Sequence, residues 1–265
     1  MAPDPLVERF PGHAYPQVIP TPDERRPGPP APWEALAVRD RASISLGRVE
    51  SRLRAAHRHL ESSAPPDQPS ELAGAGELAS RVRRSAVLVA LFERDGETHV
   101  VLTRRSLRLR QHRGEIALPG GRAEGGESLV DTALREAGEE VGLAAATARP
   151  FAWLSPIVTL VSSSAIWPIV AALDGVPTLR ANPYEVDRIF TVALADLAAD
   201  GAFVEERWRR GGPRPGADDE GFVPVRFFRV PGEVVWGATA RVLSELLCVV
   251  LDVTGPDEGA VHDVR

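Results

Sequence analysis

The chain has 265 residues, a length that fits one large domain or one domain with an appendage. Hydrophobic residues make up 43% of it and charged residues 26%, values that exclude collagen, coiled coil and wholesale disorder. No apolar run reaches the roughly 18 residues of a membrane span, and the first residues lack the basic-then-apolar order of a signal peptide. We therefore expect a cytoplasmic protein with no membrane partner.

Residue usage excludes several kinds of chemistry. Cys248 is the single cysteine, so an internal disulfide, a thiolate zinc site and an iron–sulfur cluster are excluded. All 31 basic residues are arginine, which excludes Schiff-base chemistry on lysine and the phosphate-binding lysine of a Walker loop. The net charge of −6 argues against a nucleic-acid partner. The oligomeric state does not follow from the sequence.

The charge is distributed unevenly along the chain. Residues 81–113 contain nine arginines and three acids, a net charge of +6. Residues 122–143 contain six acids and two arginines, a net charge of −4. A basic stretch beside an acidic one suits a small anionic substrate held next to a cation.

Proline and glycine divide the chain into four parts. Residues 1–32 hold ten of the 24 prolines, which predicts a disordered arm. Residues 33–80 are expected to form a helical segment followed by a linker. The compact domain is expected over residues 81–254, with a flexible tail over residues 255–265.

Within the compact domain, short strands outnumber helices. Residues 87–92 and 100–103 flank Asp95-Gly96, which predicts a β-hairpin. Further short apolar runs with strand character cover residues 151–154, 166–173, 189–194 and 225–230. Helices are expected over residues 128–141, ended by Gly142, and over residues 238–251. Strands mixed with few helices favour an α+β sandwich over a doubly wound fold.

The first of these helices carries an acidic face. At 100° per residue, an apolar stripe forms, made of Val130, Ala133, Leu134, Ala137 and Val141. Glu136, Glu139 and Glu140 share the adjoining arc, where like charges destabilise a helix unless a cation neutralises them. Hard oxygen ligands of this kind select magnesium or manganese. On its own, such an arc is most often a solvated acidic face.

The surrounding residues change that interpretation. The segment reads Gly121-x5-Glu127-x7-Arg135-Glu136-Ala137-x-Glu139-Glu140-x-Gly142-Leu143. Seven exact positions arise by chance with a probability on the order of 10⁻⁸ per starting point. The segment resembles the Nudix box, and we call residues 121–143 the box. The resemblance implies an α/β/α sandwich with a mixed sheet and a loop followed by a helix.

The resemblance also implies a reaction, which is hydrolysis of a nucleoside diphosphate linked to another moiety. It implies that Glu136, Glu139, Glu140 and the Gly120 carbonyl bind Mg²⁺ or Mn²⁺. It assigns Arg135 and Glu127 the orientation of those ligands. Such a cation neutralises the pyrophosphate and prepares water for in-line attack at phosphorus, so no covalent intermediate is needed.

A second motif precedes the box. It reads Val101-Leu-Thr103-x-Arg105-Ser106-x3-Arg110-x3-Gly114-x3-Leu118-Pro-Gly120-Gly121. It resembles the additional motif of the coenzyme A pyrophosphatase branch of the Nudix family, from which Val101 and Leu118 depart. We call residues 101–120 the pre-box motif. The resemblance assigns substrate binding to Arg105, Ser106, Arg110 and Gly114, with the two arginines suited to the 3′-phosphate of coenzyme A. Arginines that pair with surface acids remain the alternative.

Three functions follow in order. The first is a metal-dependent coenzyme A or acyl-coenzyme A diphosphatase that yields 3′,5′-ADP and 4′-phosphopantetheine or its acyl form. The second is a Nudix pyrophosphatase for another nucleoside diphosphate derivative such as ADP-ribose. The third, from a different class, is a Nudix-fold regulator that binds a nucleotide without cleaving it. Such regulators typically lose box glutamates, and this chain keeps all of them.

The general base is not fixed by the box, because its glutamates can all be occupied by metal. Acids that follow the box are the further candidates, namely Asp174, Glu185, Asp187, Glu205 and Glu206. We favour Glu185, which follows an Asn-Pro turn and precedes an expected strand. The alternative is a carboxylate that only accepts hydrogen bonds in that turn. His112, within the pre-box motif, could contact phosphate or be an ordinary surface histidine.

Overall fold

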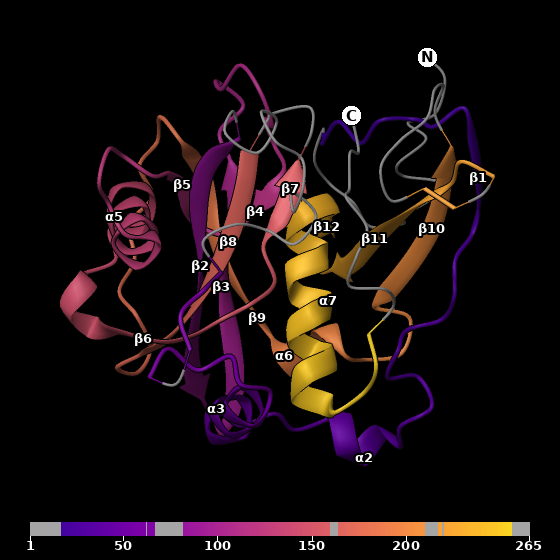
Figure 1. Ribbon diagram of the computed structural model, residues 1–265, viewed down its shortest axis with the longest axis horizontal. Coiled ribbons are helices and arrows are strands. Elements are labelled where there is room, and N and C mark those ends of the chain that lie inside the picture. The colour runs from indigo at the N-terminus through magenta and orange to yellow at the C-terminus, as the bar shows by residue number, and fades with distance from the viewer. Residues whose placement is uncertain are drawn as a thin grey trace.

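The computed structural model describes residues 17–61, 63–66, 82–159, 164–209, 217–218 and 220–255 (Figure 1). Its strands are β1 (Glu24–Pro27), β2 (Arg83–Arg94), β3 (Glu97–Arg105), β4 (Ile116–Ala117), β5 (Gly120–Arg122), β6 (Ala148–Trp153), β7 (Ile157–Thr159), β8 (Ser164–Leu173), β9 (Val186–Ala193), β10 (Phe203–Arg209), β11 (Val223–Val230) and β12 (Glu233–Trp236). Its α-helices are α2 (Val38–Arg41), α3 (Leu46–Ala55), α5 (Leu129–Val141), α6 (Leu194–Leu197) and α7 (Gly237–Leu251), and a 3₁₀ turn covers Ala145–Thr147.

The strands form two sheets. The larger sheet has the order β4-β3-β2-β8-β6, with β5 paired to β2, β7 to β8 and β9 to β3. It is mixed, because β2 runs parallel to β8 and antiparallel to β3. The smaller sheet has the order β1-β10-β11-β12 and is antiparallel throughout.

Helices cover both faces of the larger sheet, as Figure 1 shows with α5 on one side and α3 and α7 on the other. The layer under α5 contains small helix residues such as Ala133 and Ala137 against Leu88 and Trp167. The layer under α3 and α7 is larger and extends into the smaller sheet through Phe228. The expected α+β architecture, an α/β/α sandwich with a mixed sheet, is confirmed.

Local signals in the sequence placed several elements well. Asp95 and Gly96 have φ values of 53° and 80° and link β2 to β3 as the expected hairpin. The helix expected over residues 128–141 is α5, and the helix expected over residues 238–251 is α7. The apolar runs expected as strands lie in β6, β8, β9 and β11. Among the residues that the structure describes, no helix is long and apolar enough to cross a membrane.

The expected disordered arm was wrong for residues 17–32. Within this stretch, β1 pairs with β10, and the Gly28 N–H donates to the Glu205 carbonyl at 2.8 Å. Ile19 is buried against the smaller sheet. Proline is tolerated here because β1 lies at a sheet edge, where a missing N–H leaves no partner unsatisfied. Residues 1–16 of the expected arm lie outside the described residues.

The helical segment expected before the compact domain is part of its core. Trp33, Ile44, Val49 and Leu53 are fully buried in the layer under α7, so the boundary expected at residue 81 does not divide the packing. Their side chains bury apolar area against the sheet, which is the main stabilising contribution in a core. Residues 62 and 67–80 of the expected helical segment and linker, residue 81 of the expected compact domain, and residues 256–265 of the expected tail lie outside the described residues.

A buried ion pair fastens the two sheets together. Arg104 in β3 donates through Nη1 to Glu233 in β12 at 2.6 Å. Its Nε and Nη2 also contact the Asp187 carboxylate, at 2.9 and 2.7 Å. Arg104 and Glu233 are both buried, so breaking the pair would leave an unpaired charge in the interior. Arg104 immediately precedes Arg105, a residue of the predicted substrate site.

Candidate active site

Helix α5 begins and ends at the residues that its capping signals indicate. The Ser128 hydroxyl accepts a hydrogen bond from the Asp131 N–H at 3.1 Å and donates to the Asp131 carboxylate at 2.6 Å. Gly142 has φ of 67° and ends the helix in the left-handed region. Of the predicted apolar stripe, Ala133, Ala137 and Val141 are buried, whereas Val130 and Leu134 are partly buried.

Strand β5 supplies the backbone opposite the acidic arc of α5. A Cβ atom at Gly121 would lie 2.4 Å from the Glu136 carboxylate, and a Cβ atom at Gly120 would lie 2.4 Å from the Ala86 carbonyl oxygen. Neither glycine is among the described residues with a positive φ. Glycine is required at both positions because of space, since Glu136 occupies the volume that a side chain at residue 121 would need.

Glu140 is the most buried of the three box glutamates. Only 3% of it is exposed, and its Oε2 accepts from the Gly120 N–H at 3.3 Å. Its Oε1 lies 3.5 Å from Arg105 Nη1, a long ion pair. Burial raises the pKa of Glu140 to about 7, against the opposing effects of Arg105 and the Gly120 N–H. The negative charges of Glu185 and Glu136 raise it further.

The same cause acts on Glu136. Burial raises the pKa of Glu136, Arg135 lowers it, and the nearby charges of Glu139 and Glu185 raise it. Buried carboxylates that repel one another bind protons or metal cations in preference to remaining bare. The site thus concentrates negative charge where α5 meets β5.

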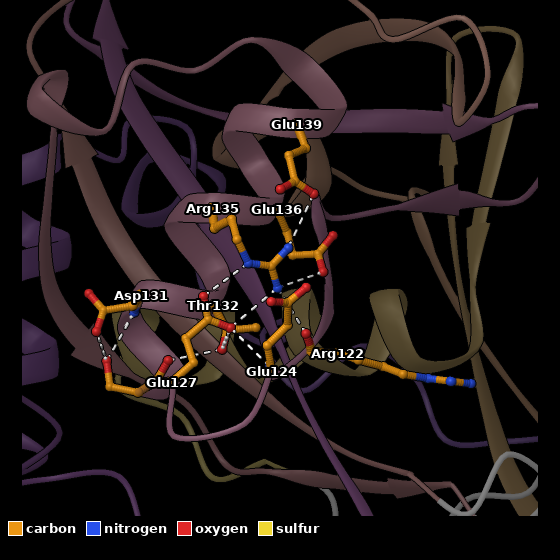
Figure 2. Close-up of polar contacts among 9 residues, drawn as sticks. Arg122, Glu124, Glu127, Asp131, Thr132, Arg135, Glu136 and Glu139 are labelled. Carbon is orange, nitrogen blue, oxygen red and sulfur yellow. Dashed lines mark hydrogen bonds and ion pairs between the residues drawn. The ribbon is translucent and has the colours of Figure 1, made fainter.

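Arg135 lies at the centre of the polar contacts shown in Figure 2. Its Nε donates to Glu127 Oε1 at 2.9 Å, its Nη2 to Glu136 Oε1 at 3.0 Å, and its Nη1 to Glu139 Oε2 at 3.1 Å. A fourth bond joins Nη2 to the Arg122 carbonyl oxygen at 2.9 Å. One guanidinium therefore fixes the directions of three carboxylates, an arrangement that suits its planar set of five donors.

Glu127 anchors this arrangement at the start of α5. The hydrogen bond from Arg135 lowers the pKa of Glu127 to about 2, and bonds from the Glu124 N–H and the Thr132 hydroxyl act in the same direction. The Thr132 hydroxyl donates to Glu127 Oε2 at 2.9 Å. Glu127 in turn raises the pKa of Arg135. With its pKa this low, Glu127 is charged at neutral pH, so the pair acts as a fixed support.

The donor atoms at this site fit a hard divalent cation. Glu136, Glu140 and the Gly120 backbone meet at β5, and carboxylate and carbonyl oxygens are the ligands that magnesium and manganese prefer. Glu139 points instead to Arg135, with 56% of its side chain exposed. Over the described ranges, no three Asp, Glu, His or Cys side chains are gathered into a group that could hold a metal ion.

The pre-box motif continues from β3 into the loop before β4. Arg105 faces the box, with its buried Nε atom lacking a hydrogen-bond partner among the described residues. Arg110 is exposed. Ser106 and Gly114 shape the loop: the Ser106 hydroxyl accepts from the Arg108 N–H at 3.3 Å, and Gly114, with φ of 74°, donates to the Arg105 carbonyl at 3.0 Å.

Glu185 lies beside the same site. Its carbonyl accepts from the Ser106 N–H at 2.8 Å, and its own N–H donates to the Asn182 carbonyl at 3.0 Å. The Asn182 N–H donates to the Glu140 carbonyl at 2.9 Å. The turn at residues 182–185 therefore connects the end of α5 with the pre-box motif and brings the Glu185 charge close to Glu136 and Glu140.

The other candidate bases have structural partners or lie at a turn. Asp187 pairs with Arg104 at 2.7 Å, and Glu205 accepts from Arg226 Nε at 3.1 Å. Glu206 accepts from the indole of Trp208 at 2.6 Å. Asp174 follows β8, where its N–H donates to the Thr147 carbonyl. His112, with its Nδ1 atom 3.0 Å from Glu115, is likewise engaged by a neighbouring side chain.

Two members of the Arg135 arrangement were missed in the sequence. Thr132 and the Arg122 carbonyl both hold it in place, by contacts to Glu127 and to Arg135. Thr132 could have been found, because it lies three residues before Arg135 on the same face of the helix. The carbonyl contact could not, since it depends on how β5 approaches α5.

Comparisons with known proteins agree with this geometry. A profile described as NUDIX domain matches residues 82–210. Nudix hydrolase 3 of Caenorhabditis elegans is 36% identical over 115 residues, which are 42% of this chain and 48% of that protein. An uncharacterized Nudix hydrolase, NudL, of Photorhabdus laumondii is 33% identical over 171 residues, 64% of this chain and 86% of that protein.

Solved structures add only a partial match. A MutT/nudix family protein from Enterococcus faecalis is 16% identical, covers 73% of this chain and 67% of its own length, and has a TM-score of 0.43. The assignment accordingly depends on the sequence matches and on the box itself. With the box intact on α5 and a relative matched over most of its length, the chain belongs to the Nudix hydrolase family.

Proposed function

We propose that the protein is a metal-dependent diphosphatase of coenzyme A or acyl-coenzyme A, which releases 3′,5′-ADP and 4′-phosphopantetheine or its acyl form. One observation carries the proposal. Arg105, from the pre-box motif, lies 3.5 Å from Glu140, from the box. The motif that resembles the coenzyme A branch is therefore part of the same site as the motif for pyrophosphate hydrolysis.

The charges around this site suit a substrate with several phosphates. Arg105 has a buried Nε donor with no partner among the described residues, and a buried donor of this kind costs free energy until an acceptor reaches it. Arg110 is exposed on the same loop, where it is available to a second phosphate group. Coenzyme A carries a 3′-phosphate besides its pyrophosphate, so it has an acceptor for each guanidinium.

The chain's own residues would divide the reaction among them. Glu136, Glu140 and the Gly120 carbonyl would hold Mg²⁺ or Mn²⁺, which supplies charge neutralisation and a more acidic water when bound. Arg135 keeps Glu136 in position through its 3.0 Å contact. Glu185 accepts a proton from the water that attacks phosphorus. The bond from that phosphorus to the bridging oxygen breaks, and each product leaves with a terminal phosphate.

The substrate assignment is tested by comparing coenzyme A with 3′-dephospho-coenzyme A. We expect the wild type to prefer coenzyme A, and Arg110→Ala to reduce the ratio of kcat/KM values by about ten- to a hundred-fold, because one charge-assisted contact is lost. Arg113→Ala is the matched control, since Arg113 is an exposed arginine of the same loop at a position that the pre-box motif leaves unspecified. Equal kcat/KM values for the two substrates in the wild type would contradict the role of Arg110. So would an equal reduction of the kcat/KM ratio in Arg110→Ala and Arg113→Ala.

A panel of substrates tests the proposal more broadly. Coenzyme A, ADP-ribose, NADH and diadenosine polyphosphates should each be incubated with the protein under Mg²⁺ and under Mn²⁺, and the products identified. We expect the hydrolysis of coenzyme A to 3′,5′-ADP to be the fastest of these reactions. A higher kcat/KM for ADP-ribose would replace the coenzyme A proposal with the second function given above. Absence of any hydrolysis, with retained nucleotide binding, would favour the regulator.

A further inference from the structure

Strand β9 contains a β-bulge close to the site at the box. Its antiparallel pairing with β3 is regular as far as Arg104, which lies opposite Arg188, and then shifts so that Arg105 lies opposite Val186. Asp187 is the residue that this shift leaves without an opposite residue on β3. Such a bulge adds one residue to one strand, bends that strand and redirects the side chains beside it.

The bulge places Asp187 on the face of the sheet that points away from the box. Successive side chains of a strand point to opposite faces, so Arg104 and Arg105 diverge. Arg105 reaches Glu140 of the box at 3.5 Å, whereas Arg104 reaches Glu233 of the smaller sheet at 2.6 Å. Asp187 contacts Arg104 on that second face. In a regular register, Asp187 would instead lie opposite Arg105, on the face of the box.

Arg104 holds the bulged residue by two atoms. Its Nε and Nη2 atoms lie 2.9 and 2.7 Å from Asp187 Oδ2, a short and charge-assisted contact. At the other end of the guanidinium, Nη1 is bound to Glu233, whose side chain is 1% exposed. Rotation of the guanidinium away from Asp187 would therefore disturb a buried ion pair, which is costly. The arrangement favours the bulged register over the regular one.

The bulge determines where the turn that carries Glu185 lies. In the observed register, the Ser106 N–H donates to the Glu185 carbonyl at 2.8 Å. In a regular register, Ser106 would lie opposite Val186, and Glu185 would lie one residue further along, opposite Leu107. A slip of one residue also turns each side chain to the other face of the sheet. The observed register thus brings Glu185 close enough to Glu140 for its charge to raise the pKa of Glu140.

We propose that Arg104 and Asp187 are positioning residues, which hold the bulge of β9 and thereby keep Glu185 directed to the site at the box. The inference rests on the proposed function, in which Glu185 accepts the proton of the attacking water. Arg104 and Asp187 meet on the face of the sheet opposite Glu140, so they act through Glu185 and not on the substrate. Their loss therefore affects the chemical step more than substrate binding.

The first measurement needs no substrate. Amide hydrogen exchange at Ser106, followed by NMR, reports whether this N–H still donates to the Glu185 carbonyl. We expect Asp187→Ala to accelerate the exchange by about ten-fold, because the contact that holds the bulge is lost. The fold should survive, since 41% of the Asp187 side chain is exposed and Glu233 still neutralises Arg104.

Two further variants show whether the effect comes from the bulge. Asp187→Asn keeps an oxygen that can accept from Arg104, so its exchange at Ser106 should remain within about threefold of the wild type. Arg188→Ala is the matched control, because Arg188 is the neighbouring residue of β9 and pairs with Glu233 at 3.3 Å. It should exchange at the wild-type rate.

Kinetics test the link to Glu185, with the compound of the panel above that the wild type hydrolyses fastest. We expect Asp187→Ala to lower kcat by about ten- to a hundred-fold and to leave KM within about twofold, because a displaced base slows the chemical step. Asp187→Asn should recover most of kcat, and Arg188→Ala should keep it. Combined with Glu185→Gln, Asp187→Ala should cause no further loss, since two residues that act through one group are not additive.

The outcomes separate this inference from the proposed function. The inference is overturned if Asp187→Ala leaves the exchange at Ser106 unchanged, or lowers kcat no more than Arg188→Ala does. It is also overturned if the loss in Asp187→Ala adds in full to the loss in Glu185→Gln. A wild-type kcat in Glu185→Gln would contradict the general base, whereas the exchange at Ser106 would still decide whether Asp187 positions the turn.

Discussion

Helices α5 and α7 pack on opposite faces of one sheet, yet they use their residues in contrasting ways. In α7, ten of 15 residues are buried, and most of them are large and aliphatic. In α5, the buried face is made largely of alanine, threonine and valine, and the adjoining face carries the charged contacts of Arg135. The helix whose buried face has the shorter side chains is the one that bears the box glutamates, because short side chains let its carboxylates approach β5.

A change on α5 that removes one carboxylate should separate activity from stability most clearly. We expect Glu140→Gln to reduce kcat by several orders of magnitude, because the amide cannot serve as an anionic metal ligand. The fold should survive, since glutamine has the same size and can still accept from the Gly120 N–H. Turnover under saturating Mg²⁺ and a thermal melt measure the two effects. Near wild-type turnover, or a wild type indifferent to EDTA, would contradict the metal assignment.

The next largest effect is expected at Glu185, which lies beside α5 without being part of it. Loss of a general base lowers kcat by roughly 10² to 10⁴-fold, so we expect Glu185→Gln to fall in this range and to flatten the acidic limb of the pH–rate profile. Asp174→Gln is the comparison, as another acid that follows the box. A small decrease that is uniform with pH would assign the base to Glu139 or to a metal-bound hydroxide.

On α7 the expected effect is on stability alone. Leu246 is fully buried in the layer under α7, so Leu246→Ala should lower the free energy of unfolding by about 2 to 5 kcal/mol. Turnover per folded molecule, measured well below the melting temperature, should remain that of the wild type. Chemical denaturation gives the first quantity and steady-state kinetics the second. A proportional fall in kcat would show that α7 positions the site at the box.

The smallest effect concerns Glu127, the carboxylate that pairs with Arg135, and it depends on pH. The folded-state pKa of Glu127 is about 2, below its ordinary 4.5, so its stabilising contribution is complete above pH 4.5 and is lost as the pH falls through about 2. We expect Glu127→Gln to have a lower melting temperature than the wild type at pH 7. This difference in melting temperature should shrink as the pH falls from 4.5 to 2. Glu124→Gln, at an exposed acid, should show no such gap. A gap independent of pH would contradict the ion-pair explanation.

Local signals explain what the sequence predicted correctly. The Asp95-Gly96 turn and the end of α5 at Gly142 each depend on residues within one turn of the chain, and the structure has both. The smaller sheet was incompletely predicted, because β10 carries a run of charged residues, Glu205, Glu206 and Arg207, and the partners of its charges come from distant segments. Glu205 and Glu206, for example, pair with Arg226 and Arg25.

In the candidate site, too, features set by local spacing were predicted, whereas features set by contacts between distant residues were not. The spacing of the box placed Glu136 and Glu140 on one side of α5, as the structure has them. The turn of Glu139 toward Arg135 was not predictable, because it depends on the competition among three carboxylates for one guanidinium. The contact between Arg105 and Glu140 joins residues 35 positions apart, so only the pairing of β3, β4 and β5 with the rest of the sheet brings them together.

The two glycines of β5 limit how this protein can be stabilised by design. Replacing glycine with alanine normally stabilises a chain by restricting its unfolded state, provided that the folded backbone accepts a side chain. At Gly120 and Gly121 the backbone torsions pose no obstacle, but the volume is already filled by the Ala86 carbonyl and the Glu136 carboxylate. An engineer who selects glycines by torsion angle alone would therefore choose two positions where a single methyl group clashes, at Gly120 with the Ala86 carbonyl and at Gly121 with the Glu136 carboxylate.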